Sequence, residues 1–234
     1  MTRTDGSACA IIVAAGRSER MGGIDKLYAE LAGRPLLAWT IGAFMRCDAI
    51  DDIVLVSSPA SLARAQDLVR EWRFDRKVIS VIPGGETRQE SVRAGLDAAD
   101  GAAIVAIHDG ARPLVAGEII DRGVELARET GAALCGVPAR DTIKRVEGQP
   151  PLVAETPPRE GLWLAQTPQC FLRDLLLRAH AEAKTTATDD AALVEAIGHP
   201  VRMYEGAASN FKVTTPEDLI VVEALLRERF AANA

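Results

Sequence analysis

One short segment gathers positive charge on a glycine-rich loop. Residues 14–26, AAGRSERMGGIDK, follow an apolar run and place Arg17, Arg20 and Lys26 around three glycines. Arginine can contact phosphate oxygens in pairs and lysine adds a point charge, so together these side chains suit a ligand with several phosphates. The small residues Ala14–Gly16 would let a base and ribose approach the backbone. The alternative is a flexible surface loop whose charges are only solvated.

A second segment, 83–88 (PGGETR), also joins an apolar run to a helix-like stretch. Its two glycines permit close backbone contact, and Arg88 and Ser91 follow in the first turns of the predicted helix. The free N–H groups at a helix start could donate to an acceptor such as a pyrimidine carbonyl. The alternative is a glycine turn in which Thr87 only caps the helix.

A third segment, HDGARP, places His108, Asp109 and Arg112 after another apolar run. A carboxylate there could hold a sugar hydroxyl or Mg²⁺, and the arginine could pair with it or with phosphate. The alternative is an Asp–Arg pair that only braces the turn. We interpret His108 as a structural histidine rather than a base. Taken alone, Lys212, in NFKVTTPED, would be a solvated surface charge.

Several function classes do not fit. The dinucleotide fingerprint GxGxxG and the P-loop GxxxxGK[ST] are both missing, which disfavours a nicotinamide-dependent reductase. A net charge of −6 argues against nucleic acid as the main partner. No apolar run approaches the ~20 residues of a membrane span, so we expect no membrane partner. Four scattered cysteines without a CxxC pair, and no Cys/His grouping, fit a cytoplasmic protein without zinc.

The order of the predicted elements indicates how these segments are positioned. Apolar runs typical of buried strands alternate with helix-like stretches, which predicts a Rossmann-like α/β fold whose mostly parallel sheet has helices on both faces. Ligands of such sheets bind beyond the carboxyl ends of the strands, where all three segments fall. The predicted strands are 8–15, 53–56, 78–82, 102–107 and 132–137. The predicted helices are 35–47, 59–72, 87–99 and 117–128.

The alternating pattern breaks between residues 139 and 168. This stretch mixes short polar and apolar alternation with prolines, and predicts β-hairpins that project from the sheet as an interaction arm. We expect a helix at 169–184, another after Thr188 as its N-cap, a strand at 201–204, and a last helix capped by Thr215. No linker is evident, so we expect one domain over 1–234.

Together these segments resemble the cytidylyltransferase group of sugar-nucleotide transferases, and most closely its 2-C-methyl-D-erythritol 4-phosphate family. The resemblance is carried by AAGRSERM, GGETRQESV, HDGARP, PARDTIKR, GLWLAQTPQ, TDDA and NFKVTTPEDL, in this order over nearly the whole chain. It implies transfer of CMP from CTP to a polyol phosphate in non-mevalonate isoprenoid synthesis. It also implies Mg²⁺, held mainly by the CTP phosphates with Asp109 as a possible ligand, and a homodimer formed through the arm.

The resemblance also implies roles for individual residues. Arg20 and Lys26 would brace the triphosphate and the transition state, and Lys212 would complete the acceptor pocket and offset the negative charge. Arg159, on the arm, would reach the acceptor of a neighbouring subunit. The residues implied around the cytidine are Ala14, Ala15, Gly16, Gly85, Glu86 and Ser91. Those implied around the acceptor are Asp109, Arg112, Thr142, Arg159, Thr167 and Lys212, with Thr142 also reaching the neighbouring subunit.

One departure from the family pattern concerns the loop lysine. The family usually has proline immediately before it, whereas Ile24 and Asp25 precede Lys26 here. Asp25 could therefore pair with Lys26 while no nucleotide is bound. Two alternatives stay open: a ribitol 5-phosphate cytidylyltransferase, whose motifs largely overlap these, and a non-catalytic nucleotide-binding protein.

Overall fold

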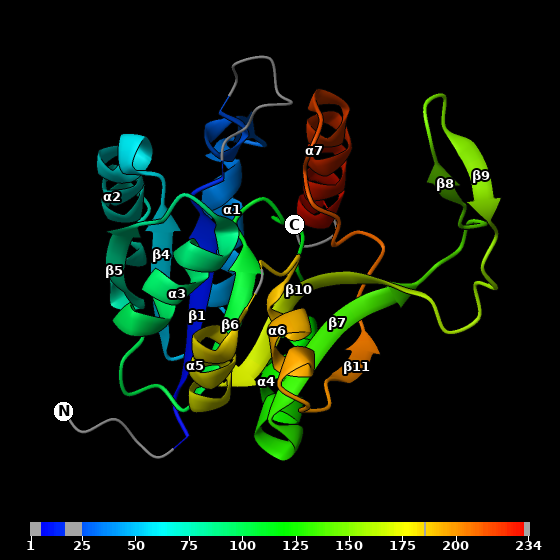
Figure 1. Ribbon diagram of the computed structural model, residues 1–234. Coiled ribbons are helices and arrows are strands. Elements are labelled where there is room, and N and C mark those ends of the chain that lie inside the picture. The colour runs from blue at the N-terminus through cyan, green and yellow to red at the C-terminus, as the bar shows by residue number, and fades with distance from the viewer. Residues whose placement is uncertain (1–5, 17–24, 185, 232–234) are drawn as a thin grey trace.

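A seven-stranded sheet forms the centre of the computed structural model, which describes residues 6–16, 25–184 and 186–231 (Figure 1). The strand order is β11-β7-β10-β6-β1-β4-β5. Every strand of this sheet runs in the same direction except β10, which is antiparallel to both neighbours. The strands are β1 (Ala8–Ala14), β4 (Asp52–Ser57), β5 (Val78–Pro83), β6 (Ile104–Asp109), β7 (Ala132–Pro138), β10 (Trp163–Leu172) and β11 (Arg202–Glu205). The predicted mostly parallel sheet is thereby confirmed.

Helices cover both faces of this sheet and bury a separate core on each. Alternate residues of β1 divide between the two cores, since successive strand side chains point to opposite faces. Ala10 and Ile12 face α1, α4 and α7, whereas Cys9 and Ile11 face α3, α5 and α6. The helices are α1 (Leu36–Met45), α2 (Leu62–Glu71), α3 (Arg88–Ala98), α4 (Gly117–Thr130), α5 (Arg173–Glu182), α6 (Asp190–Ala196) and α7 (Pro216–Ala231). Because β1 is buried on both sides, it reads as an unbroken apolar run.

The carboxyl ends of four adjacent strands lie in line along one edge of the sheet. Val13 is in register with Asp109 on one side of β1, and Ala14 with Ser57 on the other. Ser57 is in turn in register with Pro83, the last residue of β5. The chain segments that carry the predicted chemistry follow three of these four strands. The parallel arrangement therefore brings them together although they are far apart in sequence.

Strand β10 corrects two expectations. The helix predicted to begin at Gln169 begins at Arg173, and residues 169–172 instead pair with both β6 and β7. Trp163–Ala165, expected within the projecting hairpins, pair with Gly136–Pro138 as an extension of the sheet.

The N-cap of α6 is Asp189 rather than Thr188, because the Asp189 side chain accepts from the Ala192 N–H.

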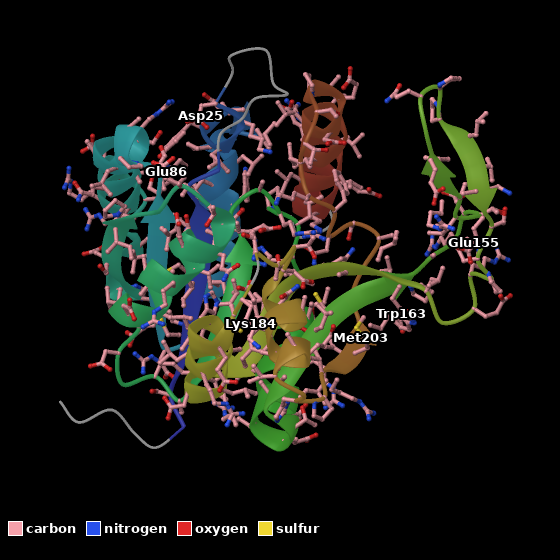
Figure 2. All side chains as sticks on the ribbon, in the orientation of Figure 1. Asp25, Glu86, Glu155, Trp163, Lys184 and Met203 are labelled. Atoms are coloured by element: carbon pink, nitrogen blue, oxygen red, sulfur yellow. The ribbon has the colours of Figure 1, made fainter. Side chains whose placement is uncertain are left out.

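The projecting segment is built from two parts. Strands β7 and β10 extend beyond the body of the sheet, and the hairpin of β8 (Arg145–Glu147) and β9 (Leu152–Glu155) lies at the far end of this extension (Figure 1). Figure 2 shows Trp163 on the extension and Glu155 on the hairpin, both outside the main body. We call residues 139–162 the arm. No helix in the described part of the chain is long and apolar enough to span a bilayer.

Candidate active site

A cavity of about 780 Å³ opens where the four strand ends meet. Short elements close its rim, among them the 3-10 helices η2 (Lys26–Tyr28) and η3 (Pro59–Ser61). Of the residues predicted to form the site, those lining the cavity are Ala14, Ala15, Gly16, Lys26, Gly85, Glu86, Ser91, Asp109 and Lys212. Figure 2 shows Glu86 and Asp25 toward the same end of the molecule. The fold therefore brings together most of the predicted nucleotide-binding residues.

The glycine segment after β5 is fixed by the start of α3. Thr87 is the N-cap: its hydroxyl accepts from the Glu90 N–H at 3.1 Å, and the Glu90 carboxylate accepts from the Thr87 N–H at 3.0 Å. This reciprocal pair is a capping box, which matches the T-x-x-E sequence. The buried Ser91 hydroxyl donates to the Thr87 carbonyl and accepts from the Gly85 N–H. Ser91 thus shapes the loop from below as well as lining the cavity.

Close packing explains why small residues occupy the wall of the cavity. A Cβ atom at Gly84 would lie 2.5 Å from the Ala15 Cβ and 2.6 Å from the Ser91 Oγ. A Cβ atom at Gly110 would lie 3.2 Å from the Ala14 Cβ and equally close to the Val13 carbonyl. The three strand-exit segments therefore touch each other directly. Any larger side chain in this wall would push them apart.

Asp109 lies at the centre of a cluster of cations. Its Oδ2 is 3.1 Å from the Lys212 ammonium and 3.4 Å from the Arg112 guanidinium, and its Oδ1 is 3.6 Å from the Arg88 guanidinium. Burial alone would raise the pKa of this carboxyl. The nearby charges of Lys212, Arg88 and Arg112 outweigh burial and hold the Asp109 pKa well below its usual range. Asp109 is therefore ionised at neutral pH.

His108 supports Asp109 from below and is already fully occupied. Its Nε2 faces the Arg112 carbonyl at 3.2 Å, which can only accept, so Nε2 carries the proton. Its Nδ1 therefore accepts from the Thr167 hydroxyl at 3.0 Å, and the same hydroxyl accepts from the Asp109 N–H. Burial lowers the His108 pKa to about 4. A neutral histidine whose two ring nitrogens both have hydrogen-bond partners is unavailable as a general base, in agreement with the sequence-based interpretation.

The two predicted lysines are joined through the loop before α7. The Lys26 ammonium donates to the Val213 carbonyl at 2.7 Å, one residue after Lys212. The Val213 N–H donates to Ala111, in the loop that follows β6, so this chain segment is tied to Asp109. Asp25 accepts from the Leu27 N–H and caps η2, which starts at Lys26. The unusual Asp25 thus has a local structural role; Ile24 lies outside the described residues.

A second cavity, of about 510 Å³, adjoins the first and shares Lys212 with it. Arg112 and Thr142 line it, together with Gln166 and Phe211. Thr142 therefore lies on a cavity of its own chain, beside the predicted acceptor residues. Thr167, by contrast, lines neither cavity: it is buried beneath the site and holds Asp109 and His108 in place.

One other predicted residue of the described part of the chain, Arg159, lines neither cavity. Arg159 is exposed at the base of the arm, where its guanidinium donates to the Arg140 carbonyl at 2.7 Å. Arg20 lies outside the described residues. Sequence reasoning expected Arg88 to face a ligand, and it lines the cavity, but its pairing with two carboxylates was not anticipated. The second of these is Asp190, in the TDDA motif, which no local pattern marked as part of the site.

Comparison with known proteins agrees with this geometry. Residues 8–228 match the family model described as 2-C-methyl-D-erythritol 4-phosphate cytidylyltransferase. A protein of that name from Dehalococcoides mccartyi is 48% identical over 219 residues, which cover 94% of this chain and 96% of the relative.

Two solved structures extend the similarity to the fold. A crystal structure of 4-diphosphocytidyl-2C-methyl-D-erythritol synthase from Anaerococcus prevotii has a TM-score of 0.83 at 30% identity, and covers 95% of this chain and all of that one. The enzyme from Thermus thermophilus has a TM-score of 0.75 at 36% identity, covering 94% of this chain and 98% of that one. The chain belongs to the 2-C-methyl-D-erythritol 4-phosphate cytidylyltransferase family.

Proposed function

We propose that this protein transfers CMP from CTP to 2-C-methyl-D-erythritol 4-phosphate in the larger cavity. This is the reaction that gives the family its name. The acceptor phosphate oxygen forms a bond to the α-phosphorus of CTP while the bond from that phosphorus to the β-phosphate oxygen breaks. The products are 4-diphosphocytidyl-2-C-methyl-D-erythritol and pyrophosphate, so this is a step of non-mevalonate isoprenoid precursor synthesis. The observation that carries the proposal is the convergence of Lys26, Lys212 and Asp109 on one cavity beside the glycine segment.

The reaction does not need a base from the protein. A phosphate monoester has a second pKa near 6, so the nucleophile is largely a dianion at pH 7. None of the described residues lining the cavity is a histidine or cysteine. The main barrier is electrostatic, because this dianion must approach the highly charged triphosphate. Fixed cations that offset the repulsion and align the reactants are the contribution that this site can make.

Each cation has a position suited to one part of this task. Lys26 lies on η2 at the rim next to Ala14–Gly16, where the triphosphate of a bound nucleotide would lie if its base contacts the glycine segment. Lys212 lies between the two cavities, so it can contact both the nucleotide and the acceptor phosphate. Arg112 reaches the second cavity, which we assign to the acceptor. Arg20 joins them as a ligand of the triphosphate on the strength of the family resemblance alone.

Mg²⁺ fits this site only in company with the nucleotide. Within residues 6–16, 25–184 and 186–231, no three Asp, Glu, His or Cys side chains form a metal-binding group. Asp109 offers one carboxylate, and magnesium is commonly held by one or two carboxylates together with substrate phosphates. We therefore assign Mg²⁺ mainly to the CTP phosphates, with Asp109 as a protein ligand. Bound there, the ion would neutralise phosphate charge in the same way as the lysines.

The arm supports a homodimer. Leu152 and Val153 on β9 are 69% and 61% exposed, and Trp163 and Leu164 on β10 are also exposed. Apolar side chains gathered on a projecting segment favour contact with another protein surface. A second copy of the arm is the partner that the family resemblance implies, and Arg159 would then reach the second cavity of the neighbouring subunit.

The four described cysteines are free thiols, which supports a reducing cytoplasmic location.

A pyrophosphate-release assay tests the function directly. The protein is given CTP, Mg²⁺ and either 2-C-methyl-D-erythritol 4-phosphate or ribitol 5-phosphate, with ATP and UTP as nucleotide controls. We expect release with CTP and the methylerythritol phosphate, and at least 10-fold lower kcat/KM with ribitol phosphate, the range that a small change in pocket fit supplies. No release with either acceptor would overturn the proposal, whereas preference for ribitol phosphate would reassign the substrate.

A further inference from the structure

A buried carboxylate outside both cavities has no place in the reaction as described above. Asp190 is the first residue of α6 and is 1% exposed. Its Oδ2 accepts from the Arg88 Nη1 at 2.7 Å. Its Oδ1 makes no hydrogen bond in the described part of the chain and lies 3.4 Å from the buried His180 Nε2. A carboxylate buried this deeply is costly unless it is paired with a cation, and Arg88 is that cation.

Asp190 is held firmly in relation to the strand that carries Asp109. The Gln169 side chain accepts from the backbone N–H groups of Asp190 and Ala191, at 3.1 and 3.0 Å, and donates to Asp189. Gln169 lies on β10, directly opposite Ile107 of β6. Asp109 ends β6 two residues later. The start of α6 and Asp109 are therefore fixed to the same pair of strands.

Arg88 connects the two carboxylates. It is the first residue of α3, lines the larger cavity, and has a side chain that is only 29% exposed. Its guanidinium makes a normal hydrogen bond to Asp190 but stays 3.6 Å from Asp109, beyond hydrogen-bond distance. The buried partner thus determines where the guanidinium lies. Burial lowers the Arg88 pKa but the charges of Asp190 and Asp109 more than offset this and raise it.

The two oxygens of Asp109 differ as a result. Oδ2 already contacts both Lys212 and Arg112, at 3.1 and 3.4 Å. Among the described residues, Oδ1 has only the longer contact to Arg88, so it is the oxygen better placed to receive a ligand from the cavity. If Arg88 moved 0.5–1 Å closer, a charge-assisted hydrogen bond of about 2.8 Å would occupy Oδ1.

We propose that Asp190 is a positioning residue for the nucleotidyl transfer. By holding Arg88 away from Asp109, it keeps Oδ1 of that carboxylate open in the larger cavity, where the family resemblance places Asp109 against the acceptor. This inference rests on the proposed function. Without the Asp190 charge, Arg88 turns to its remaining carboxylate and closes Oδ1. Use of the acceptor then suffers most, whereas CTP keeps the glycine segment, the lysines and the Mg²⁺ that its own phosphates mainly hold.

The test is Asp190→Asn, which keeps the shape of the side chain and removes its charge. We expect kcat/KM for the acceptor to fall about 10-fold or more, the usual effect of losing an outer-shell partner, while the KM for CTP stays within about threefold. Asp189→Asn is the matched control, because asparagine caps a helix as well as aspartate. The control should retain acceptor kcat/KM within about twofold. Urea unfolding of both variants checks that the fold is intact.

A second pair of variants separates positioning from a structural role. In an Arg88→Gln background no guanidinium can move onto Asp109, so adding Asp190→Asn should change acceptor kcat/KM by less than about threefold. Should Asp190→Asn fail to fold, Asp190→Ser carries the test, because it also removes the charge that holds Arg88 and the same acceptor-selective loss is expected. An equal rise in the CTP and acceptor KM values, a full additive loss in the double variant, or normal activity would overturn the inference. Wild-type enzyme in the same assay reports separately on the proposed function.

Discussion

Lys212 is the residue on which the proposed mechanism depends most. It lies on both cavities and contacts Asp109, and its side chain is 40% exposed, so it can reorient toward a phosphate. We predict that Lys212→Ala lowers kcat about 10²-fold, equivalent to ~3 kcal/mol of transition-state stabilisation, by analogy with the loss of one oxyanion-hole donor. Steady-state pyrophosphate release measures this effect, and the urea midpoint should change little.

Lys184 provides the control for this substitution. It lies after α5, away from the labelled residues Asp25 and Glu86 at the cavity end of the molecule (Figure 2). Lys184→Ala removes the same net charge and should leave kcat within about twofold. If Lys212→Ala and Lys184→Ala gave the same kcat, a general loss of positive charge, and not a cation at the site, would explain the change.

His108 predicts a particular dependence of stability on pH. Its pKa is about 4 in the folded protein against 6.5 when unperturbed, because burial disfavours the charged ring. Asp109, Arg112 and Lys212 are the charged groups that act on it. Between these two pH values the unfolded chain binds the extra proton, so stability falls as the pH is lowered from 6.5 to 4. Each pH unit in this range lowers the unfolding free energy by about 1.36 kcal/mol, so His108 accounts for a loss of about 2 kcal/mol between pH 6.5 and 5.

Urea unfolding at several pH values tests this prediction. His108→Asn cannot titrate in this range, so its unfolding free energy should lack that part of the decline, even though its stability at pH 7 is lower. His199→Asn, at a partly exposed position after α6, should keep the wild-type slope. The same decline in His108→Asn and wild type would show that the buried ring is not the titrating group.

At the scale of elements, the segment between β5 and α3 depends on close packing. Gly84→Ala would place a methyl group 2.5 Å from Ala15, whose own Cβ is fixed on the exit of β1. We expect the two segments to separate, with a loss of about 1–3 kcal/mol in stability, as is usual for overpacking, and at least a 10-fold rise in the KM for CTP. Gly117→Ala is the control, because no heavy atom lies within 4 Å of the new Cβ. It should change neither the stability nor the KM for CTP.

The same elements show what sequence reasoning could and could not reach. Strands buried on both faces and the capping box at Thr87 leave clear local patterns, so the parallel sheet and the glycine segment were predictable. Strand β10 was missed because its apolar end runs directly into the apolar face of α5, and a short apolar run does not distinguish strand from helix. Thr167 and Arg88 owe their roles to partners 58 and 102 residues away, at Asp109 and Asp190, which no local pattern reveals.

At the scale of the whole molecule, the arm separates two kinds of residue that the proposed reaction needs together. Lys26 and Lys212 lie at the sheet edge, whereas Arg159 lies at the arm and lines neither cavity of its own chain. The apolar side chains of Leu152 and Val153 on β9, and of Trp163 and Leu164 on β10, are exposed in the single chain. A symmetric dimer that pairs two arms would cover them, and would bring each Arg159 to the partner's acceptor side.

Mixing two inactive variants distinguishes a shared site from a site within one chain. Arg159→Ala and Lys26→Ala should each be nearly inactive alone, the first through weaker acceptor binding and the second through a lower kcat. After subunit exchange in equal amounts, about half of the dimers are mixed, and each mixed dimer has one site with both side chains intact. Recovery of about a quarter of wild-type activity is therefore expected. If Arg159 instead served its own chain, every site in the mixture would lack one of the two side chains, and exchange would restore nothing.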